Sequence, residues 1–284
     1  MPEGPEVLGT QKSLKLHLQS KYLIDLCIYS TSRHASKGIE GMQYLKRGLY
    51  LQDILVKGKR IIFDLVNIYT NQHIFLLSFL GMEGHWVKEK TKHTSISICF
   101  GDIDLNSRLF SPKNVKTFYF DDSRHFGFIK IFPDQKELDN ALKNVGPDLL
   151  NEEVSYDTYY ATIKKPILTN KQICWFLLEQ KYFSGIGNYL KSEILYSSRI
   201  APYRIIGTLT DQEIYNLYCF SLNIIREAAD KNGLTIATYI DPDGVKGTFE
   251  TKVYNKKIDP YGYNVTKETF TDKRMTHWVP GVQV

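Results

Sequence analysis

Few features of this sequence suit a secreted, membrane-bound or disulfide-bonded protein. Its cysteines are scattered, without a C-x-x-C pair or a nearby histidine at metal-ligand spacing; they are Cys27, Cys99, Cys174 and Cys219. We interpret them as small buried side chains, not as metal ligands or a disulfide framework. No run of about 18 apolar residues indicates a membrane span, and no charged leader with an apolar stretch indicates a signal peptide. We expect a soluble, monomeric intracellular protein of the nucleus or cytoplasm, with no cofactor.

The composition is that of a globular protein with a large core. Of the 284 residues, 43% are hydrophobic and 13% are aromatic, and the length is sufficient for two domains. Lysine and arginine total 36 against 31 acidic residues, which gives a net charge of +5. This mild excess of positive charge permits a nucleic acid as partner but does not establish one.

The N-terminal half has the pattern of a helix followed by many strands. Val7, Leu14 and Leu18 mark one face of a helix that begins after Pro5 and ends near Gln19. Short runs rich in β-branched residues follow without intervening helices, which predicts an antiparallel β-sandwich. The runs cover 23–30, 51–56, 60–66, 73–80, 95–100, 117–120 and 128–132, with a hairpin turn at "KGK" (57–59).

The pattern becomes helical after "VGPDLLNEEV" (145–154). Helices are predicted at 170–180, 188–198 and 211–230, the last with a capping box of Thr210 and Glu213 and a stop at Asn232-Gly233. Strands are predicted again at 248–255, 265–271 and 274–279. We therefore expect an α+β protein with an N-terminal domain at 1–133, a linker at 134–152 and a C-terminal domain at 153–284.

Two stretches place polar or glycine residues at the start of a helix. "MPEGPEV" (1–7) has a proline at position 2 and two glutamates, which has a structural explanation: proline suits the first helical turn and acids oppose the helix dipole. In "SGIGNYLKSEI" (184–194) the glycines predict a tight turn before Asn188. Free N–H groups at such a helix start bind phosphate; the alternative is a glycine turn between two packed helices.

Two other stretches place unusual side chains in loops. In "FDDSRHFGF" (120–128), Arg124 and Phe126 would lie at a hairpin tip, where they have no core to fill. A cation beside an exposed aromatic ring suits a loop that enters DNA and wedges between bases. In "FLGMEGHW" (79–86), Met82 lies between glycines, where methionine more commonly fills a gap in a core.

Taken in order, these stretches resemble the Fpg/Nei family of DNA glycosylases over nearly the whole chain. The opening is similar to the family's Met-Pro-Glu start, and Gly4 matches the endonuclease VIII branch, since the formamidopyrimidine branch has leucine there. "KGKRIIF" resembles the family's hairpin with its lysine at Lys59, "LGMEG" its loop methionine and "RHFG" its Arg-x-Phe-Gly loop. "LLEQKYFSGIGNYLKSEILYSSRIAPY" resembles its helix-two-turn-helix motif, especially that of eukaryotic endonuclease VIII-like enzymes. The resemblance implies an N-terminal β-sandwich flanked by helices and a C-terminal helix-two-turn-helix domain.

The C-terminal segment resembles the family's four-cysteine zinc finger, but the cysteines are replaced. In "VYNKKIDPYGYNVTKETFTDKRMTHWVPGVQ" the four ligand positions hold Asp259, Gly262, Val279 and Val282. Without thiolates the usual tetrahedral zinc site cannot form. The resemblance therefore implies a zincless finger at about 248–279 with Arg274 at its tip. We expect strand pairing and three aromatic side chains to hold the hairpin instead: Tyr254, Phe270 and Trp278.

The resemblance also implies a chemical mechanism. If Met1 is removed, Pro2 presents a secondary amine, a useful fraction of which is neutral near pH 7. This amine attacks C1′ of a damaged nucleotide, expels the base as a Schiff base forms, and leads to strand cleavage by β,δ-elimination. Glu3 would protonate the sugar ring oxygen and transfer protons, and Glu6 would position the sugar. The implied partner is damaged double-stranded DNA, with single-stranded DNA as a further substrate.

Further side chains are implied to hold the DNA. Lys59, which we group with the catalytic residues, would contact a phosphate beside the lesion together with Asn188 and Arg274. Once the damaged base leaves the stack, other side chains would fill the void. The candidates are Met82, Arg124 and Phe126.

Two other functions remain open from the sequence. Helix-two-turn-helix units also occur in non-catalytic nucleic-acid-binding proteins, including a ribosomal one, but such a binder has no need of Pro-Glu at positions 2 and 3. A lyase that acts only on abasic sites is a third interpretation. Among damaged bases, Gly4 and the helical segment favour oxidised pyrimidines and hydantoins. The segment "TYIDPDGVKGTF" (238–249) lies where the formamidopyrimidine branch has a loop over 8-oxoguanine, which leaves purine activity open.

Overall fold

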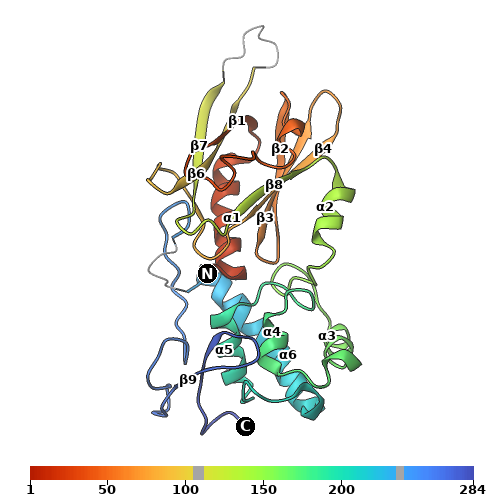
Figure 1. Cartoon of the computed structure of the whole chain (residues 1–284), viewed down its shortest axis with the longest axis vertical. Helices are drawn as coiled ribbons and strands as arrows, with labels where there is room; N and C mark the ends of the chain where they lie inside the picture. Colours follow the sequence, from red (N-terminus) through yellow and green to blue (C-terminus); the bar gives the residue numbers. More distant parts are fainter. Residues whose placement is uncertain (105–111, 235–239) are drawn as a thin grey trace. The chain divides into compact units, whose positions relative to one another are not determined.

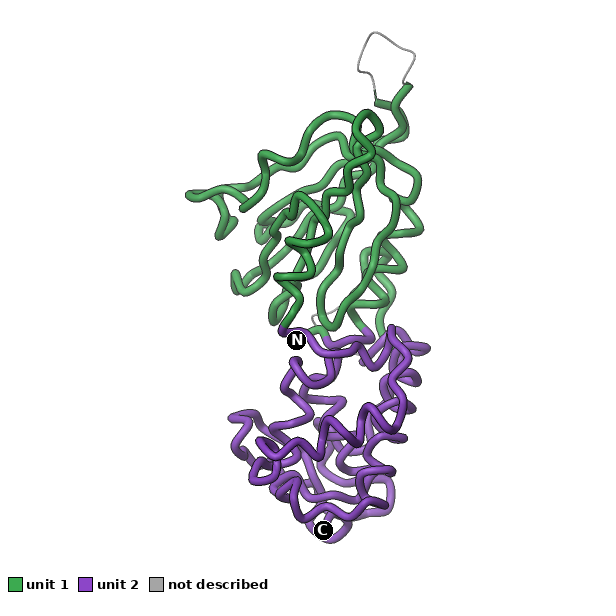
Figure 2. Tube along the Cα trace, turned by 90° about the vertical axis from the view of Figure 1, so that its right-hand side faces the viewer, with its two compact units in different colours: residues 1–2, 6–143, 236–247 green, residues 3–5, 144–235, 248–284 purple. Residues whose placement is uncertain are grey.

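The computed structural model describes residues 1–104, 112–234 and 240–284. The chain folds as two compact units, which Figure 2 colours separately. Unit 1 contains Met1–Pro2, Glu6–Lys143 and Ile236–Gly247, and unit 2 contains Glu3–Pro5, Asn144–Thr235 and Thr248–Val284. The domain boundaries at 133 and 153 stay a prediction. The segment between them contains helix α2 (Gln135–Leu142), which we did not predict.

Unit 1 is built from helix α1 (Gly4–Leu18) and an antiparallel sheet, as the sequence predicted (Figure 1). In the described residues the sheet has eight strands in the order β5-β7-β6-β1-β2-β3-β4-β8. The strands are β1 (Tyr22–Ile28), β2 (Leu49–Lys57), β3 (Arg60–Asn67), β4 (His73–Phe79), β5 (His85–Val87), β6 (Thr94–Asp102), β7 (Lys113–Asp121) and β8 (Phe128–Phe132). Of these, only the short β5 has no counterpart in the predicted strands.

The sheet consists of two halves that meet at a single residue pair. β1 and β2 pair only at Tyr22 and Tyr50. The two halves nevertheless share one core, because Phe63 of β3 stacks on Phe100 of β6 with ring centroids 6.4 Å apart. The predicted helix face of Val7, Leu14 and Leu18 is fully buried in the same core. The eight strands therefore form one continuous sheet that folds over on itself. It encloses the core as the two sheets of a β-sandwich do.

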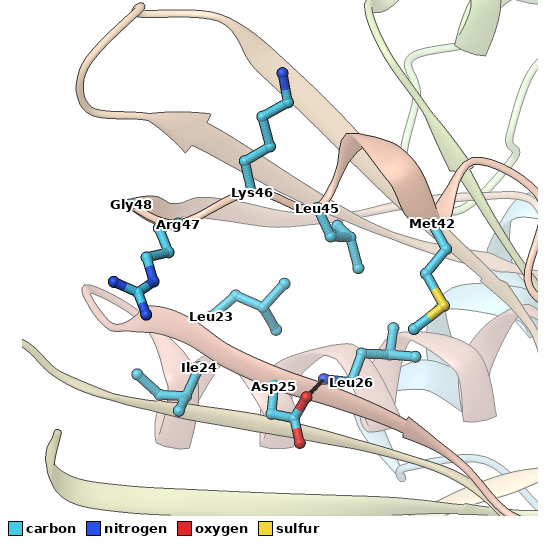
Figure 3. Close-up of a pocket in the computed structure, with 9 residues that line it drawn as sticks. All are labelled: Leu23, Ile24, Asp25, Leu26, Met42, Leu45, Lys46, Arg47 and Gly48. Atoms are coloured by element: carbon cyan, nitrogen blue, oxygen red, sulfur yellow. Dashed lines mark hydrogen bonds between the residues drawn. The ribbon is translucent and has the colours of Figure 1, made fainter. Parts of the chain in front are cut away.

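A cavity of about 320 Å³ opens where β1 and β2 separate (Figure 3). It lies between β1 and the segment that leads into β2, and apolar side chains such as Leu26 and Met42 line it. The N–H of Leu26 donates to the carboxylate of Asp25 at 2.9 Å. Because this carboxylate already accepts the Leu26 N–H, that N–H is not available to pair with another strand at this part of the β1 edge.

Helix α2 covers the outer face of the β4 region. Leu138 of α2 packs with Phe75 and Leu77 of β4 and with Phe132 of β8. The other face of β4 contributes Ile74 and Leu76 to the main core. Both faces of β4 are therefore covered, which explains its nearly continuous apolar sequence.

Unit 2 contains four α-helices in its described residues: α3 (Tyr156–Ile163), α4 (Ile173–Leu178), α5 (Asn188–Ser197) and α6 (Asp211–Asp230). The capping box predicted for α6 is present, since Thr210 and Glu213 exchange side-chain-to-backbone hydrogen bonds. Helix α3 was not predicted, and α4 is shorter than the predicted 170–180. No helix in the described part of the chain is long and apolar enough to cross a membrane.

The C-terminal strands are only partly as predicted. β9 (Thr266–Thr269) and β10 (Met275–Trp278) pair as an antiparallel hairpin, which confirms two of them. The strand predicted at 248–255 is wrong. There the carboxylate of Glu193 on α5 accepts the N–H groups of Lys252, Val253 and Tyr254 at 2.8–3.0 Å. These donors bind a side chain, so they cannot form a strand ladder.

Candidate active site

Glu3 lies at the N-terminus of helix α5, and both belong to unit 2. Its carboxylate accepts the N–H groups of Gly187 at 2.7 Å, Tyr189 at 2.9 Å and Leu190 at 3.3 Å. A negative charge here satisfies open N–H groups and opposes the dipole of α5. Two sequence-based interpretations need correction. These N–H groups bind Glu3 and not a phosphate, and Glu3 opposes the dipole of α5, whereas Glu6 is the acid in the first turn of α1.

Glycines make this close approach possible. A Cβ atom at position 187 would lie 2.2 Å from Cδ of Glu3, so only glycine leaves room for the carboxylate. The N–H of Gly4 donates to the carbonyl of Gly185 at 2.8 Å, and a Cβ at position 4 would lie 3.1 Å from that oxygen. The close contact with Gly185 therefore gives a structural explanation for glycine at position 4.

Gln180 holds the loop that precedes α5. Its side-chain amide donates to the carbonyl of Ile186 at 2.9 Å, and its Oε1 accepts the N–H of Gly185 at 3.2 Å. Helix α4 ends at Leu178, before Gln180, so these bonds hold the loop and not the helix. Sequence reasoning missed this residue, although it lies in the quoted "LLEQ" stretch.

Asn188 and Arg274 come together around the C-terminal hairpin of unit 2. Asn188 begins α5, and its Nδ2 donates to the carbonyl of Met275, the residue after Arg274, at 2.8 Å. Arg274 is exposed in the turn between β9 and β10, where its N–H donates to Asp272 at 3.1 Å. Two of the three side chains predicted to bind phosphate thus lie on a helix start and on the hairpin that contacts it.

A buried ion pair fastens this hairpin to α5. Nζ of Lys191 bonds to the carboxylate of Asp272, and their side chains are 0% and 1% exposed. Burial lowers the pKa of Lys191, although the contact with Asp272 acts in the opposite direction. Asp272 also accepts the N–H of Arg274, so the pair positions the predicted phosphate-binding tip. Sequence reasoning missed the pair; a lysine amid the apolar residues of α5 was the available signal.

In unit 1 the structure brings the Met82 loop and the Arg124–Phe126 loop together. A Cβ at Gly81 would lie 2.6 Å from the carbonyl carbon of Phe126, which shows how closely the two backbones approach. The Arg124 guanidinium lies 5.1 Å from the Phe126 ring centroid and 3.6 Å from Glu83. Phe126 is 50% exposed. An exposed ring with a cation beside it is the arrangement expected for a side chain that enters DNA.

The Arg124–Phe126 loop is not a hairpin tip, contrary to the sequence-based expectation. It connects β7 and β8, but β7 pairs with β5 and β6, whereas β8 pairs with β4. The loop therefore crosses between the two halves of the sheet. Alternating apolar residues predicted both strands but not their partners, because pairing is a non-local choice.

The other predicted site residues of unit 1 are buried. Lys59 follows Gly58 in the turn between β2 and β3, where Lys57 pairs with Arg60 and Gly58 has a φ of 63°. This confirms the hairpin. Lys59 is 8% exposed, Glu6 is fully buried, and Pro2 is buried as well.

The comparison with known proteins gives two family matches. The "Formamidopyrimidine-DNA glycosylase N-terminal domain" matches residues 1–129, and the "Formamidopyrimidine-DNA glycosylase H2TH domain" matches residues 145–239. The chain belongs to this family. The predicted family and the predicted enzyme class, a DNA glycosylase, are thereby confirmed, whereas the endonuclease VIII-like branch stays a prediction.

Several family members match over their full length. The formamidopyrimidine-DNA glycosylases of Bacillus cereus and Listeria monocytogenes are each 27% identical to this chain. The alignments cover 99% and 100% of this chain and 98% and 100% of the relatives. Among solved structures, the MutM (Fpg) protein of Thermus thermophilus has a TM-score of 0.83 at 24% identity, covering 99% of this chain and 98% of that one. The Lactococcus lactis Fpg, in complex with abasic-site DNA, has a TM-score of 0.81 at 24% identity, with 99% of both chains covered.

Asp259 lies at the first of the four positions where the family has a zinc-binding cysteine. Its carboxylate already accepts three hydrogen bonds within the protein. It accepts the N–H groups of Tyr261 and Tyr263 at 2.9 and 2.8 Å and the hydroxyl of Tyr196 at 2.8 Å. Gly262, at the second position, has a φ of 92° and offers no side-chain ligand. The carboxylate therefore closes the turn by itself.

The other two positions are apolar and do not fit a metal ion. Val279 packs with Tyr196 and Val253 in a buried cluster, and Val282 lies against it. In the described residues, no group of three or more His, Cys, Asp or Glu side chains is arranged to hold a metal ion. These four residues therefore offer one carboxylate, and no thiolate or imidazole, as a zinc ligand.

The aromatic packing of the hairpin is partly as predicted. Phe270 and Trp278 pack edge to face with centroids 6.2 Å apart, and Tyr203 contacts both rings. Tyr254 does not join them; it packs against His277 at 4.8 Å and Tyr189 at 6.2 Å. Tyr254 therefore packs on the hairpin through His277 of β10, as predicted, while Glu193 holds its backbone to α5.

His277 of β10 is a buried histidine that sequence reasoning missed. It is 4% exposed, and neither ring nitrogen has a hydrogen-bond partner within the described residues. Burial lowers the pKa of His277, and the charges of Lys267 and Lys191 lower it further. The folded protein therefore favours the neutral imidazole.

Acid should weaken the hairpin through His277. Its folded pKa lies below the unfolded value of about 6.5, so its contribution to stability is complete above that pH. The contribution falls by at most about 1.4 kcal/mol per pH unit as the pH drops from 6.5 through the folded pKa. In melting curves between pH 8 and pH 5, His277→Phe should lose less stability on acidification than the natural protein. Equal pH slopes for the two proteins would contradict this assignment.

Proposed function

We propose that this family member is a bifunctional DNA glycosylase and AP lyase of base excision repair. It excises oxidised bases through a Schiff base on Pro2 and cleaves the strand by β,δ-elimination. The observation that carries the proposal is the attachment of Glu3 to the N-terminus of α5 by three backbone N–H groups. This contact holds the residue next to Pro2 at the start of the helix whose first residue is Asn188. A protein that only binds DNA has no need of Pro-Glu at positions 2 and 3.

Pro2 and Glu3 each have one task in the proposed reaction. With Met1 removed, the Pro2 nitrogen bonds to C1′, the glycosidic bond breaks and the base leaves. The Glu3 carboxylate takes the proton that the Pro2 nitrogen loses and passes it to the ring oxygen as the sugar opens. The iminium has a positive charge without protonation, so it acidifies the C2′ hydrogens. Loss of that proton expels the 3′ phosphate, a second elimination expels the 5′ phosphate, and water releases Pro2.

The remaining site residues position the DNA. Lys59, Asn188 and Arg274 contact phosphates beside the lesion, and Glu6 orients the sugar. Met82, Arg124 and Phe126 fill the space left by the flipped base. The 50% exposed ring of Phe126, with the Arg124 guanidinium beside it, supports this role.

For the lesion we propose oxidised pyrimidines and hydantoins as the favoured bases, as in the endonuclease VIII-like branch. Gly4 and the helix-two-turn-helix sequence support this choice. The relatives reported above have the formamidopyrimidine name, but a Lactococcus lactis Fpg structure contains DNA with an oxidised pyrimidine. Of the segment at 238–249, residues 238 and 239 lie outside the described residues. Asp243 in the same segment bonds to Ser13 and Lys88 at 2.5 Å and to His17 at 2.7 Å.

The test is a panel of duplexes that each contain one lesion. We expect excision and cleavage of 5-hydroxyuracil and hydantoin duplexes, slower action on 8-oxoguanine, and a product with phosphates at both ends of the gap. Cleavage of abasic sites alone would identify a lyase without glycosylase activity. Binding without cleavage would identify a non-catalytic DNA-binding protein.

Glu3→Gln should separate the two activities. Excision of intact damaged bases needs a proton to help the base leave, whereas cleavage of a preformed abasic site does not. We expect excision to fall on the order of 10²–10⁴-fold and abasic-site cleavage to fall much less. Melting curves must accompany the assay, because the new amide would face the N–H groups of α5. A parallel loss of both activities would assign Glu3 a positioning role.

We also propose that the C-terminal hairpin is a zincless finger. Asp259 and the valine cluster occupy the places where ligands would be needed. Metal analysis of the purified protein should find no stoichiometric zinc, and a chelator should leave cleavage of abasic-site DNA unchanged. Zinc at one ion per chain, with activity lost to the chelator, would show that this interpretation is wrong.

A further inference from the structure

A second pocket, in unit 2, has the features of a binding site that the proposed function does not use. It has a volume of about 720 Å³, and we call it the knuckle pocket. Aromatic side chains and two cations dominate its lining, and none of the described residues that line it is acidic. The aromatic residues are Tyr196, Phe220, Tyr261 and Tyr263, and the cations are Arg199 and Lys252.

The knuckle pocket lies away from the residues of the candidate active site in unit 2. Tyr196 and Arg199 are at the C-terminal end of α5, whereas Glu3 and Asn188 lie at its N-terminal end. At 1.5 Å per residue, the two ends of α5 are about 14 Å apart. The lining residues of the pocket are therefore distinct from Glu3 and Asn188 of the candidate active site.

The two most exposed tyrosines of the pocket stand on a rigid turn. Tyr261 is 80% exposed and Tyr263 is 53% exposed. Both backbone N–H groups bond to the buried carboxylate of Asp259, and the N–H of Asp259 bonds to the carbonyl of Tyr263 at 2.9 Å. The backbone that presents the rings is thus already ordered, so ligand binding would lose little entropy there.

An equivalent turn elsewhere in the chain shows that the tyrosines are not needed for folding. In "DPDGV" (241–245), Asp241 accepts the N–H groups of Asp243 and Val245 at 2.9 and 2.8 Å, and its own N–H bonds to the carbonyl of Val245 at 3.1 Å. In "DPYGY" (259–263) the same bonds form, with Tyr261 and Tyr263 at the matching places. Aspartate and valine support the same geometry, so the exposed rings require another explanation.

We propose that the knuckle pocket binds single-stranded nucleic acid, with bases stacked on Tyr261 and Tyr263 and phosphates beside Arg199 and Lys252. Exposed aromatic rings flanked by cations, in a lining without acidic residues, are the combination that unpaired nucleic acid requires. A fully paired duplex does not fit, because its bases are not free to stack on protein. The proposal goes beyond the proposed function, since it requires neither damage nor catalysis. An acidic peptide also matches the charge, and the experiment separates the two.

The test uses an eight-nucleotide oligo(dT) with a fluorescent label, measured by anisotropy. Tyr261→Leu/Tyr263→Val should weaken binding by about tenfold or more, the loss expected when stacking is removed. The matched variant Tyr261→Phe/Tyr263→Phe should bind normally, because it keeps both rings. Inorganic polyphosphate, which has the negative charge without bases, should displace oligo(dT) from the natural protein only weakly. Crosslinking with 5-iododeoxyuridine in the oligomer should label Tyr261 or Tyr263.

Further measurements distinguish this site from the active site. Cleavage of a short abasic duplex by the Leu/Val variant should be unchanged, and Tyr69→Ala, which removes a 74% exposed tyrosine of unit 1, should alter neither activity. Equal oligo(dT) affinity for the natural protein and the Leu/Val variant, or crosslinks confined to other residues, would overturn the proposal. Binding of a labelled oligoglutamate that depends on these rings, without binding of oligo(dT), would assign the pocket to a protein partner instead. If the natural protein and all the variants lack the proposed glycosylase activity, the oligo(dT) and crosslinking measurements still test the knuckle pocket, because they require no catalysis.

Discussion

Protein that retains Met1 should form no borohydride-trapped complex with abasic-site DNA, whereas protein that begins at Pro2 should be trapped. The reason is chemical: an acylated proline nitrogen has no lone pair available to attack C1′, so no reducible Schiff base forms. Strand cleavage should fall on the order of 10³-fold or more, as when a covalent nucleophile is removed from other enzymes. Gel analysis of the trapped complex, with mass spectrometry of the N-terminus, measures both quantities on one preparation.

A second N-terminal variant serves as the control. Pro2→Ala, after removal of Met1, presents a primary amine, whose imine must gain a proton before it can withdraw electrons as strongly. Its trapping should therefore be weak but detectable. DNA affinity of the Met1-retaining protein for an uncleavable abasic analogue should change little if the block is chemical. Equal trapping with and without Met1 would remove Pro2 from the mechanism.

Lys191→Met should destabilise the protein by about 3–5 kcal/mol. This is the usual cost of removing one partner of a buried ion pair and leaving the other charge uncompensated. Asp272 would be that stranded charge, since its side chain is 1% exposed. Because Asp272 also holds the N–H of Arg274, DNA binding should weaken and its salt dependence should fall by about one phosphate contact. Denaturant unfolding and salt titrations of DNA affinity measure the two effects.

The double variant and an exposed pair make this prediction specific. Lys191→Met/Asp272→Leu should recover much of the stability, because an apolar pair replaces the charges, but it should not recover the Arg274 position. Lys231→Met breaks an exposed ion pair with Glu227, whose side chains are 45% and 54% exposed, and should cost less than about 0.5 kcal/mol. A loss in Lys191→Met as small as in Lys231→Met would show that the buried pair does not hold the hairpin.

The predicted site residues were those that a sequence motif can specify. Pro2, Glu3 and Asn188 lie in short stretches whose order along the chain carries the family resemblance. Lys191, Gln180 and His277 were missed because each acts through contacts that a local motif does not reveal. Lys191, for example, lies in a helix that reads as apolar, and its importance depends on Asp272, which is 81 positions away in the chain.

The sequence alone determined the helices with strong local signals and most of the strands. The capping box of Thr210 and Glu213 defines the start of α6 because its bonds connect residues three positions apart. The β2–β3 hairpin was predictable for the same reason, since Gly58 permits the turn and the two strands that it joins pair with each other. The replacement of the zinc ligands by Asp259, Gly262, Val279 and Val282 was also visible in the sequence.

Tertiary structure decided where these elements find their hydrogen-bond partners. The carboxylate of Glu193 converts a predicted strand at 248–255 into irregular chain, and Glu3 takes the N–H groups expected to bind a phosphate. The loop of Arg124 and Phe126 joins two strands that pair with other strands and not with each other. In the first two cases a buried backbone group must be satisfied, and a side chain remote in sequence competes for it. Such competition depends on the folded arrangement, and local residue patterns do not contain it.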